Sequence, residues 1–239
     1  MSLETAMVLA AGLGTRMRPL TDACPKALIA LNGRPLIDHM LGRLLEGGVT
    51  RCVVNNHYCA EMLEEHLAQV ANPSIAFSRE MEAPLETGGA IKKARRLLGE
   101  EPIFVANTDS VWRGGAPAAR SLAQAWDPAR MDALLLVVPL ENTLGFDGAG
   151  DFFLDPGGRL RFRGEAPAAP YAFMGLHICK PQVAYDEPDE AFSLSRVWRR
   201  LAQGGRLHGV VFEGFWMHVG DPGALAAAEA YLARTHAAE

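Results

Sequence analysis

The chain has 239 residues, of which 49% are hydrophobic and 21% are charged. This balance is typical of a soluble globular protein with a substantial buried core, and it excludes a disordered or fibrous chain. The formal net charge of −5 argues against non-specific binding to nucleic acid. A polyanionic ligand would therefore have to be met by a few basic residues placed locally.

The cysteines and the apolar runs indicate the compartment. The four cysteines are scattered without CxxC spacing, which predicts free thiols in a reducing compartment: Cys24, Cys52, Cys59 and Cys179. The N-terminal apolar run is short and has no basic residues before it, so we expect no signal peptide. The run Ala133–Leu140 is far shorter than the roughly 20 residues that span a bilayer. We expect a cytoplasmic protein that has no membrane or nucleic-acid partner and is a monomer or weak homodimer.

The first two thirds of the chain alternates short apolar runs with amphipathic segments. The runs predict strands at Met7–Ala11, Arg51–Asn55, Ile75–Ser78, Ile103–Ala106 and Ala133–Pro139. The segments predict helices at Pro35–Glu46, Glu61–Val70, Gly89–Leu98 and Ala118–Trp126. Strands that are apolar on both faces and separated by helices indicate an α/β fold around a parallel sheet. Ligands of such sheets bind at the carboxyl ends of the strands.

After residue 145 the pattern becomes richer in strands. Alternating residues on both sides of Asp155–Gly158 predict a hairpin of Asp151–Leu154 and Leu160–Phe162. The remaining predicted elements are strands at Tyr171–Ile178 and Leu207–Phe212 and helices at Ser193–Ala202 and Pro222–Arg234. Because no linker or repeat interrupts the chain, we predict one domain over residues 1–239. Its core would span 1–140, and a β-rich part with the last helix would span 141–239.

A glycine-rich loop after the first strand carries the densest chemical signal. Gly12 and Gly14 allow backbone amides to approach a ligand, and the cations Arg16 and Lys26 follow. Backbone N–H groups and cations together form a polyphosphate cradle. The loop is neither a Walker A motif nor a dinucleotide fingerprint, because Met17 stands where GxGxxG has its third glycine. The alternative is a tight turn with solvated arginines.

Two further segments are candidates for ligand contact. The glycines of PLETGGA at Pro84–Ala90 suit close backbone approach at the start of a helix; alternatively, Thr87 only caps that helix. Asp109 follows the strand Ile103–Ala106, where a carboxylate at the carboxyl end of a parallel strand could bring a hard cation to phosphate oxygens. An Asx turn that ends the strand is the alternative for Asp109.

The loop sequence GLGTRMRPLTDACPK closely resembles the signature G-x-G-(S/T)-R-x-x-P-L-(T/S)-x-x-x-P-K of sugar-1-phosphate nucleotidylyltransferases, and ALIALNGRPLIDH at Ala27–His39 resembles its continuation. The resemblance implies a three-layer αβα Rossmann-like, GT-A-like fold with a mixed, mostly parallel sheet. It implies that the core over 1–140 binds the nucleotide and that the β-rich part over 141–239 binds the sugar phosphate. It also implies an enzyme that joins a nucleoside triphosphate to a sugar 1-phosphate and releases pyrophosphate.

The resemblance further implies roles for individual residues. The catalytic residues would be Arg16, Lys26 and Asp109, with Asp109 also holding Mg²⁺ or, alternatively, Mn²⁺. Residues that bind the nucleotide would be Ala10, Ala11, Gly12, Gly14, Thr15, Arg16, Lys26, Glu86, Thr87 and Gly88. Residues that bind the sugar phosphate would be Asn107, Asp151, Tyr171 and Gly175.

A second resemblance is narrower. The segments GFDGAGDF at Gly145–Phe152, PLETGG and GFWMHVG are similar to those of the N-acetylmuramate α-1-phosphate uridylyltransferases of peptidoglycan recycling. This similarity implies UTP and N-acetylmuramic acid 1-phosphate as substrates. A guanylyltransferase for mannose or heptose 1-phosphate is the alternative within the enzyme class, and a catalytically silent nucleotide-sugar-binding regulatory subunit is the alternative outside it.

One position departs from the wider family. The family has W-x-D-x-G-T, whose aspartate is a second metal ligand, whereas this chain has His218 in WMHVGD. Magnesium prefers oxygen ligands, and manganese tolerates imidazole better. Three alternatives remain: the metal is held by Asp109 and substrate phosphates alone, Asp221 reaches in, or His218 binds a phosphate, a metal-bound water or the metal itself.

Overall fold

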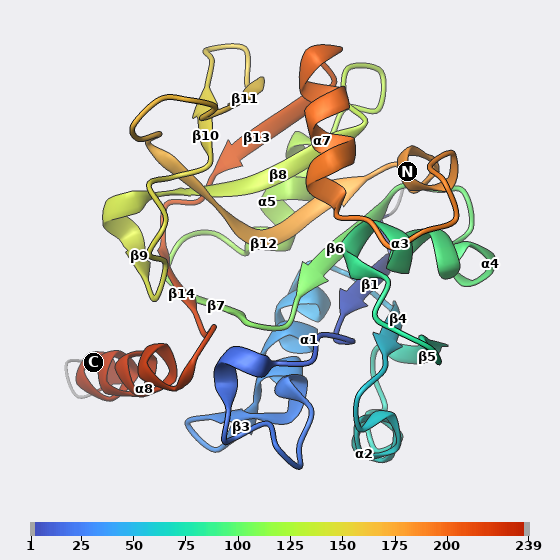
Figure 1. Ribbon diagram of the computed structural model, residues 1–239. Helices are drawn as coiled ribbons and strands as arrows, with labels where there is room; N and C mark the ends of the chain where they lie inside the picture. Colours follow the sequence, from blue (N-terminus) through green and yellow to red (C-terminus); the bar gives the residue numbers. More distant parts are fainter. Residues whose placement is uncertain (1–2, 237–239) are drawn as a thin grey trace.

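The computed structural model describes residues 3–236, and its centre is a nine-stranded mixed sheet (Figure 1). Four neighbouring strands are parallel and lie in the order β5–β4–β1–β6. Their bounds are β1 Thr5–Leu9, β4 Arg51–Asn56, β5 Ser74–Arg79 and β6 Ile103–Asn107. Because they are parallel, their carboxyl ends meet at one edge of the sheet, where the loops that carry the sequence motifs begin.

The later part of the chain extends this sheet. Strand β12 (Tyr171–Cys179) runs antiparallel between β6 and β8 (Ala133–Pro139), and β13 (Leu207–Val211) is parallel to β8. The predicted hairpin is present as β10 (Phe152–Leu154) and β11 (Leu160–Phe162), and β10 pairs with the start of β12. The sheet is therefore mixed, as predicted.

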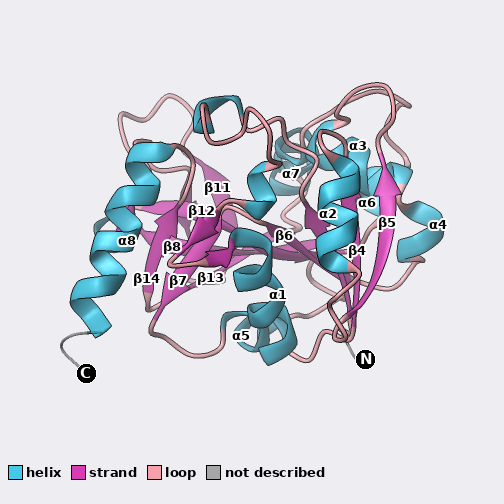
Figure 2. Ribbon diagram, turned by 90° about the horizontal axis from the view of Figure 1, so that it is seen from below, coloured by secondary structure: helices cyan, strands magenta, loops and turns pink. Residues whose placement is uncertain are grey.

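Helices cover both faces of the sheet, which confirms the three-layer α/β fold (Figure 2). On β1, Ala6 and Val8 belong to one hydrophobic cluster and Met7 to another, because successive side chains of a strand point to opposite faces. The first cluster contains α1 (Leu36–Glu46), α2 (Ala60–Leu67) and α5 (Ala118–Ala125). The second contains α3 (Glu86–Lys93), α4 (Arg95–Leu98), α6 (Gln182–Tyr185) and α7 (Leu194–Gln203).

A third cluster fixes the glycine-rich loop to the C-terminal helix α8 (Pro222–His236). Met17 from the loop, Met217 from the small sheet and Leu232 from α8 are all buried in it. The small sheet has the order β7–β14–β9. Shorter elements complete the chain: β2 Ala30–Leu31, β3 Arg34–Pro35, β7 Ser110–Arg113, β9 Thr143–Leu144, β14 Phe215–His218 and the 3-10 helices η1 Thr15–Met17, η2 Lys26–Leu28 and η3 Leu140–Asn142.

The structure differs from the sequence predictions mainly at short elements. The single helix predicted at Gly89–Leu98 begins earlier, at Glu86, and is divided at Ala94 into α3 and α4. The strands β7, β9 and β14 were not predicted, because segments of two to four residues carry too little periodicity to stand out. Within residues 3–236, no helix is both long and apolar enough to cross a membrane.

Candidate active site

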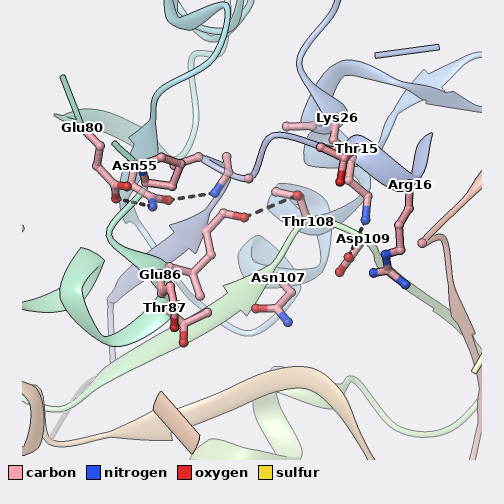
Figure 3. Close-up of a pocket in the computed structure, with 18 residues that line it drawn as sticks. Thr15, Arg16, Lys26, Asn55, Glu80, Glu86, Thr87, Asn107, Thr108 and Asp109 are labelled. Atoms are coloured by element: carbon pink, nitrogen blue, oxygen red, sulfur yellow. Dashed lines mark hydrogen bonds and ion pairs between the residues drawn. The ribbon is translucent and has the colours of Figure 1, made fainter. Parts of the chain in front are cut away.

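A cavity of about 320 Å³ opens at the carboxyl ends of β1, β4 and β6 (Figure 3). This is the edge at which the sequence motifs were expected to meet. We call this cavity the main cleft. It is lined by eleven of the predicted site residues, namely Ala10, Ala11, Gly12, Gly14, Thr15, Arg16, Lys26, Glu86, Thr87, Asn107 and Asp109.

The glycine loop forms one wall of the main cleft. Gly14 has a positive φ of 61°, and a Cβ added there would lie 3.0 Å from both Lys26 Cβ and Thr21 Cγ2. The Thr21 hydroxyl donates a 2.8 Å hydrogen bond to the Gly14 carbonyl, which holds this turn. At Gly12 an added Cβ would meet no atom within 4 Å, so the backbone there faces open space. The loop has the close-approach geometry expected of a phosphate cradle.

Lys26 and Asp109 form an ion pair at the same wall. Lys26 Nζ lies 2.6 Å from Asp109 Oδ2, and the two side chains are only 14% and 20% exposed. His218 Nε2 lies 3.4 Å from the same carboxylate oxygen. The His218 Nδ1 is 3.3 Å from the Gly145 carbonyl oxygen on the other side of the ring.

The charge of Asp109 follows from these contacts. Burial by itself would raise the pKa of the Asp109 carboxyl, but the His218 ring and the Lys26 ammonium outweigh it and hold that pKa well below its ordinary value. The carboxylate is therefore ionised throughout the physiological pH range. An ionised carboxylate at the carboxyl end of β6 is a suitable ligand for a hard cation.

Arg16 completes the positive side of the main cleft, beside Asp109 (Figure 3). A Cβ added at Gly220 would lie 3.4 Å from Arg16 Nη1 and 3.0 Å from His218 Cε1, so these two side chains flank the backbone of Gly220. The N–H of Val219 donates a 2.8 Å hydrogen bond to the Asp109 carbonyl. The segment after β14 is thus fixed against the end of β6.

A buried polar network at the main cleft joins the end of β4 to two loops (Figure 3). Asn55 Oδ1 accepts a 2.8 Å hydrogen bond from the Ala10 N–H, and Asn55 Nδ2 donates a 2.7 Å bond to Glu80 Oε1. Glu80 Oε2 accepts a 2.7 Å bond from the Leu85 N–H. Asn55 and Glu80 are 4% and 2% exposed. The network therefore fixes the glycine loop relative to the loop before α3.

Replacing Asn55 by alanine is expected to lower the free energy of unfolding by about 2–4 kcal/mol, since it leaves the buried Ala10 N–H and one Glu80 oxygen without partners. The measurement is urea unfolding followed by circular dichroism. Asn56→Ala serves as the matched control, because the Asn56 side chain makes a single hydrogen bond, to Glu64, which Arg79 also contacts. Equal destabilisation by the two substitutions would contradict the anchoring role of Asn55.

Glu86 and Thr87 lie at the opposite end of the main cleft from Lys26 (Figure 3). Glu86 has a positive φ of 58°, a strained conformation that costs about 1–3 kcal/mol and is found mainly at functional sites. The interpretation of Thr87 as a helix cap is wrong: α3 is preceded by Leu85, and the Thr87 hydroxyl instead accepts the Leu194 N–H at 2.8 Å.

Gly88 lies beside the main cleft rather than in its lining. Its N–H donates a 2.8 Å hydrogen bond to the Phe192 carbonyl, and an added Cβ would lie 2.1 Å from the Phe192 ring. The glycine allows α3 to pack against the segment before α7. A nucleotide contact at Gly88 stays a prediction.

The structure does not bring the four predicted sugar-phosphate residues together in one cavity. Gly175 adjoins the main cleft: a Cβ there would lie 2.1 Å from Ser110 Oγ and 3.2 Å from Asn107 Cβ. Asp151 lines a second cavity of about 330 Å³, between the β10–β11 hairpin and α7. We call it the hairpin cavity. Tyr171 pairs with Phe152 and Pro139 within the sheet and lines neither cavity.

Asp221 caps a helix and does not contact Asp109. Its Oδ1 accepts a 2.9 Å hydrogen bond from the Ala224 N–H, so it caps the first turn of α8. Of the two side chains proposed to assist Asp109, only His218 contacts it.

The comparisons with known proteins agree with this geometry. Residues 5–235 match the family described as nucleotidyl transferase. The chain belongs to the nucleotidyl transferase family. It is 53% identical over 235 residues to the N-acetylmuramate alpha-1-phosphate uridylyltransferase of Caulobacter vibrioides, which covers 96% of this chain and 97% of that protein. These findings confirm the resemblance seen in the sequence motifs.

Two further relatives are more distant. The N-acetylmuramate alpha-1-phosphate uridylyltransferase of Neisseria meningitidis serogroup B is 35% identical over 219 residues, 90% of this chain and 92% of that protein. Mannose-1-phosphate guanyltransferase beta-A of Xenopus laevis is 29% identical over 229 residues, 91% of this chain but 61% of that protein. A solved UDP-glucose pyrophosphorylase in complex with UDP-glucose has the same fold, with a TM-score of 0.79, 17% identity and coverage of 98% of this chain and 100% of that one.

The donor set of this nucleotidyl transferase fits a magnesium ion shared with its substrate. In the part of the chain that the structure describes, no three His, Cys, Asp or Glu side chains form a metal cage of their own. Magnesium is commonly held by one or two carboxylates, with substrate phosphates and water as the other ligands. Asp109 supplies such a carboxylate.

Sequence reasoning missed three polar residues that line the main cleft: Asn55, Glu80 and Thr108. Each follows or lies at the end of a predicted strand, and strand ends on a parallel sheet form the ligand-binding edge. Applying that rule to every strand, and to both residues that follow it, would have found all three.

Proposed function

We propose that the protein transfers a uridylyl group from UTP to N-acetylmuramic acid 1-phosphate, which yields a nucleotide-sugar and pyrophosphate. The observation that carries the proposal is the ionised Asp109 paired with Lys26 beside the glycine loop. The 53% identity to a uridylyltransferase of that description, against 29% to a mannose-1-phosphate guanyltransferase, favours this substrate pair. A cytoplasmic role in peptidoglycan recycling belongs to the same proposal.

The reaction needs positioning and charge neutralisation more than proton transfer. The attacking group is the phosphate of the sugar 1-phosphate, whose second pKa is about 6, so it is largely ionised near pH 7 without a general base. It attacks the α-phosphorus in line with the departing pyrophosphate. The N–H groups of the glycine loop and the side chains of Arg16 and Lys26 stabilise the charge that develops on the phosphates. Glu86 and Thr87 contact the base.

Asp109 would hold a magnesium ion together with the substrate phosphates. When bound, that ion neutralises phosphate charge and orients the reacting groups. The chain's own contribution is to keep Asp109 ionised and to place Lys26 next to it.

A substrate matrix tests the proposed function. Pyrophosphate release is measured for four nucleoside triphosphates against a panel of sugar 1-phosphates, with and without Mg²⁺. We expect release that depends on Mg²⁺ and is fastest with UTP and N-acetylmuramic acid 1-phosphate. Fastest release with GTP and mannose or heptose 1-phosphate would instead assign a guanylyltransferase. Nucleotide-sugar binding without any release would assign a silent regulatory subunit.

Replacing His218 by aspartate is expected to retain or raise activity with Mg²⁺, because a second carboxylate oxygen beside Asp109 suits magnesium better than an imidazole does. The measurement is kcat/KM of the wild type and of His218→Asp with Mg²⁺ and with Mn²⁺. Loss of activity with both metals would contradict this expectation and would assign the ring a specific role of its own.

A further inference from the structure

The hairpin cavity is lined by two arginines and a single carboxylate of the described chain. Arg199 from α7 and Arg163 after β11 both line it, together with the carboxylate of Asp151. Within residues 3–236, neither arginine has an ion-pair partner, whereas Arg196 and Arg200, on the same helix as Arg199, both pair with Glu187. A cavity lined by aromatic rings, two arginines and one carboxylate is suited to a sugar that carries an anionic group.

Arg199 is exposed, and its guanidinium lies over an aromatic ring. Its guanidinium carbon lies 4.5 Å from the centre of the Phe162 ring, a cation–π contact that leaves the edge of the guanidinium free to donate hydrogen bonds. Arg163 is held differently, because its Nε donates to the Gly150 carbonyl at 2.9 Å and its Nη1 to the Ala166 carbonyl at 3.1 Å. Arg199 is therefore the guanidinium with its full set of donors available.

Asp151 provides a hydrogen-bond acceptor in the same cavity, where the arginines provide donors. Its Oδ2 accepts a 2.9 Å hydrogen bond from the Phe173 N–H. Burial raises the pKa of the Asp151 carboxyl, while that N–H and the charge of Arg163 oppose the rise. Its second oxygen can accept from a ligand hydroxyl or amide. The cavity thus offers an acceptor for a sugar O–H or N–H close to donors for an anion.

Two connections place the hairpin cavity next to the main cleft. Thr87, in the main cleft, accepts the Leu194 N–H, and the following residue, Ser195, lines the hairpin cavity. Strand β12 provides the second connection, since Gly175 adjoins Asn107, and Phe173, two residues earlier, contacts Asp151. Phe173 and Gly175 lie on one strand, where the β12–β8 register shifts at a β-bulge. The hairpin cavity therefore adjoins the end of the main cleft that holds Thr87 and Asn107.

We propose that Arg199 binds a carboxylate on the sugar ring of the acceptor, and that it thereby selects acidic sugar 1-phosphates over neutral ones. This inference rests on the proposed function, because N-acetylmuramic acid carries such a carboxylate and N-acetylglucosamine does not. Charge-assisted hydrogen bonds to a carboxylate are the stronger kind, and arginine donates two in parallel. Arg199 is accordingly a specificity-determining residue.

The test compares two acceptors on the same enzyme variant. A substitution that lowers activity toward both acceptors equally then leaves their ratio of kcat/KM unchanged. kcat/KM is measured with UTP for N-acetylmuramic acid 1-phosphate and for N-acetylglucosamine 1-phosphate, and the binding of each acceptor is measured by calorimetry. Arg199→Gln is expected to lower the preference for the acidic acceptor by about 10- to 100-fold, with the larger part in KM. Arg199→Lys keeps the charge but not the paired donors. Its preference for the acidic acceptor is expected to lie between those of the wild type and Arg199→Gln.

Arg161→Gln is the matched control. Arg161 also lies over an aromatic ring, 4.3 Å from the centre of Phe153. Both Arg161 and Arg199 line a neighbouring hollow, but only Arg199 also lines the hairpin cavity. Its substitution is expected to leave the preference unchanged. An unchanged preference in Arg199→Gln, or an equal fall in Arg161→Gln, would overturn the inference while leaving the proposed function intact. If the wild type turns over neither acceptor, the proposed function fails, and equal calorimetric affinities for the two acceptors would then overturn the inference separately.

Discussion

Replacing Lys26 by alanine is expected to lower kcat/KM by about 10²- to 10³-fold while the protein stays folded. Lys26 carries the ammonium that lies 2.6 Å from Asp109, at a side-chain exposure of 14%, where water screens charge poorly. Without it, developing negative charge on the phosphates loses a preorganised partner. The measurement is the initial rate of pyrophosphate release over a range of UTP concentrations.

Lys180→Ala is the matched control for Lys26→Ala. Lys180 Nζ forms an ion pair of similar length, 2.7 Å, with Asp132, and neither residue lines the main cleft. We expect Lys180→Ala to reduce stability slightly and to leave kcat/KM within about twofold of the wild type, since Arg206 still contacts Asp132. If Lys26→Ala also retained wild-type turnover, Lys26 would not act on the phosphates.

Replacing Asp109 by asparagine is expected to lower kcat by about 10²- to 10³-fold, because it removes the ionised oxygen that faces Lys26 and would hold the metal. The amide has nearly the same shape, so the fold should persist. Two measurements apply: the rate with Mg²⁺, and the affinity for Mn²⁺ in the presence of UTP by electron paramagnetic resonance.

Asp132→Asn is the matched control for Asp109→Asn. Hydrogen bonds from Arg206, with the nearby charge of Lys180, lower the pKa of Asp132 to about 2 despite its partial burial, so it too is an ionised, paired carboxylate. Its replacement should cost stability at neutral pH and should change neither kcat nor the affinity for Mn²⁺. Unchanged Mn²⁺ affinity in Asp109→Asn would show that Asp109 is not the metal ligand.

The order and type of the main elements could be predicted because strands that are buried on both faces of a sheet are apolar at every position. Leu134 to Val138 are all buried, and they were recognised as a strand from their unbroken apolar character. Asp109 was placed at the ligand-binding edge for the same reason, since the apolar residues of β6 end three positions before it, at Ala106. At these positions the apolar pattern of neighbouring residues is enough to predict the strand and where it ends.

The contacts that complete the site depend on pairing between distant segments. His218 reaches Asp109 because β14 pairs with β7 in a register that sets His218 opposite Ser110, and short strands give no signal of their partner. Asn55 and Glu80 are 25 positions apart and are ordinary polar residues until folding buries them together. Asp151 was assigned to the sugar by resemblance, but only the packing of α7 against the hairpin places Arg199 in the same cavity.

Identification of the product tests the central claim most directly. The purified protein is incubated with Mg²⁺, UTP and N-acetylmuramic acid 1-phosphate, and in parallel with GTP and mannose 1-phosphate, and products are identified by mass spectrometry. We predict UDP-N-acetylmuramic acid with one pyrophosphate per nucleotide-sugar, and kcat/KM at least about tenfold higher than for the guanylyl reaction. Faster formation of GDP-mannose, or the absence of a nucleotide-sugar from either pair, would contradict the account.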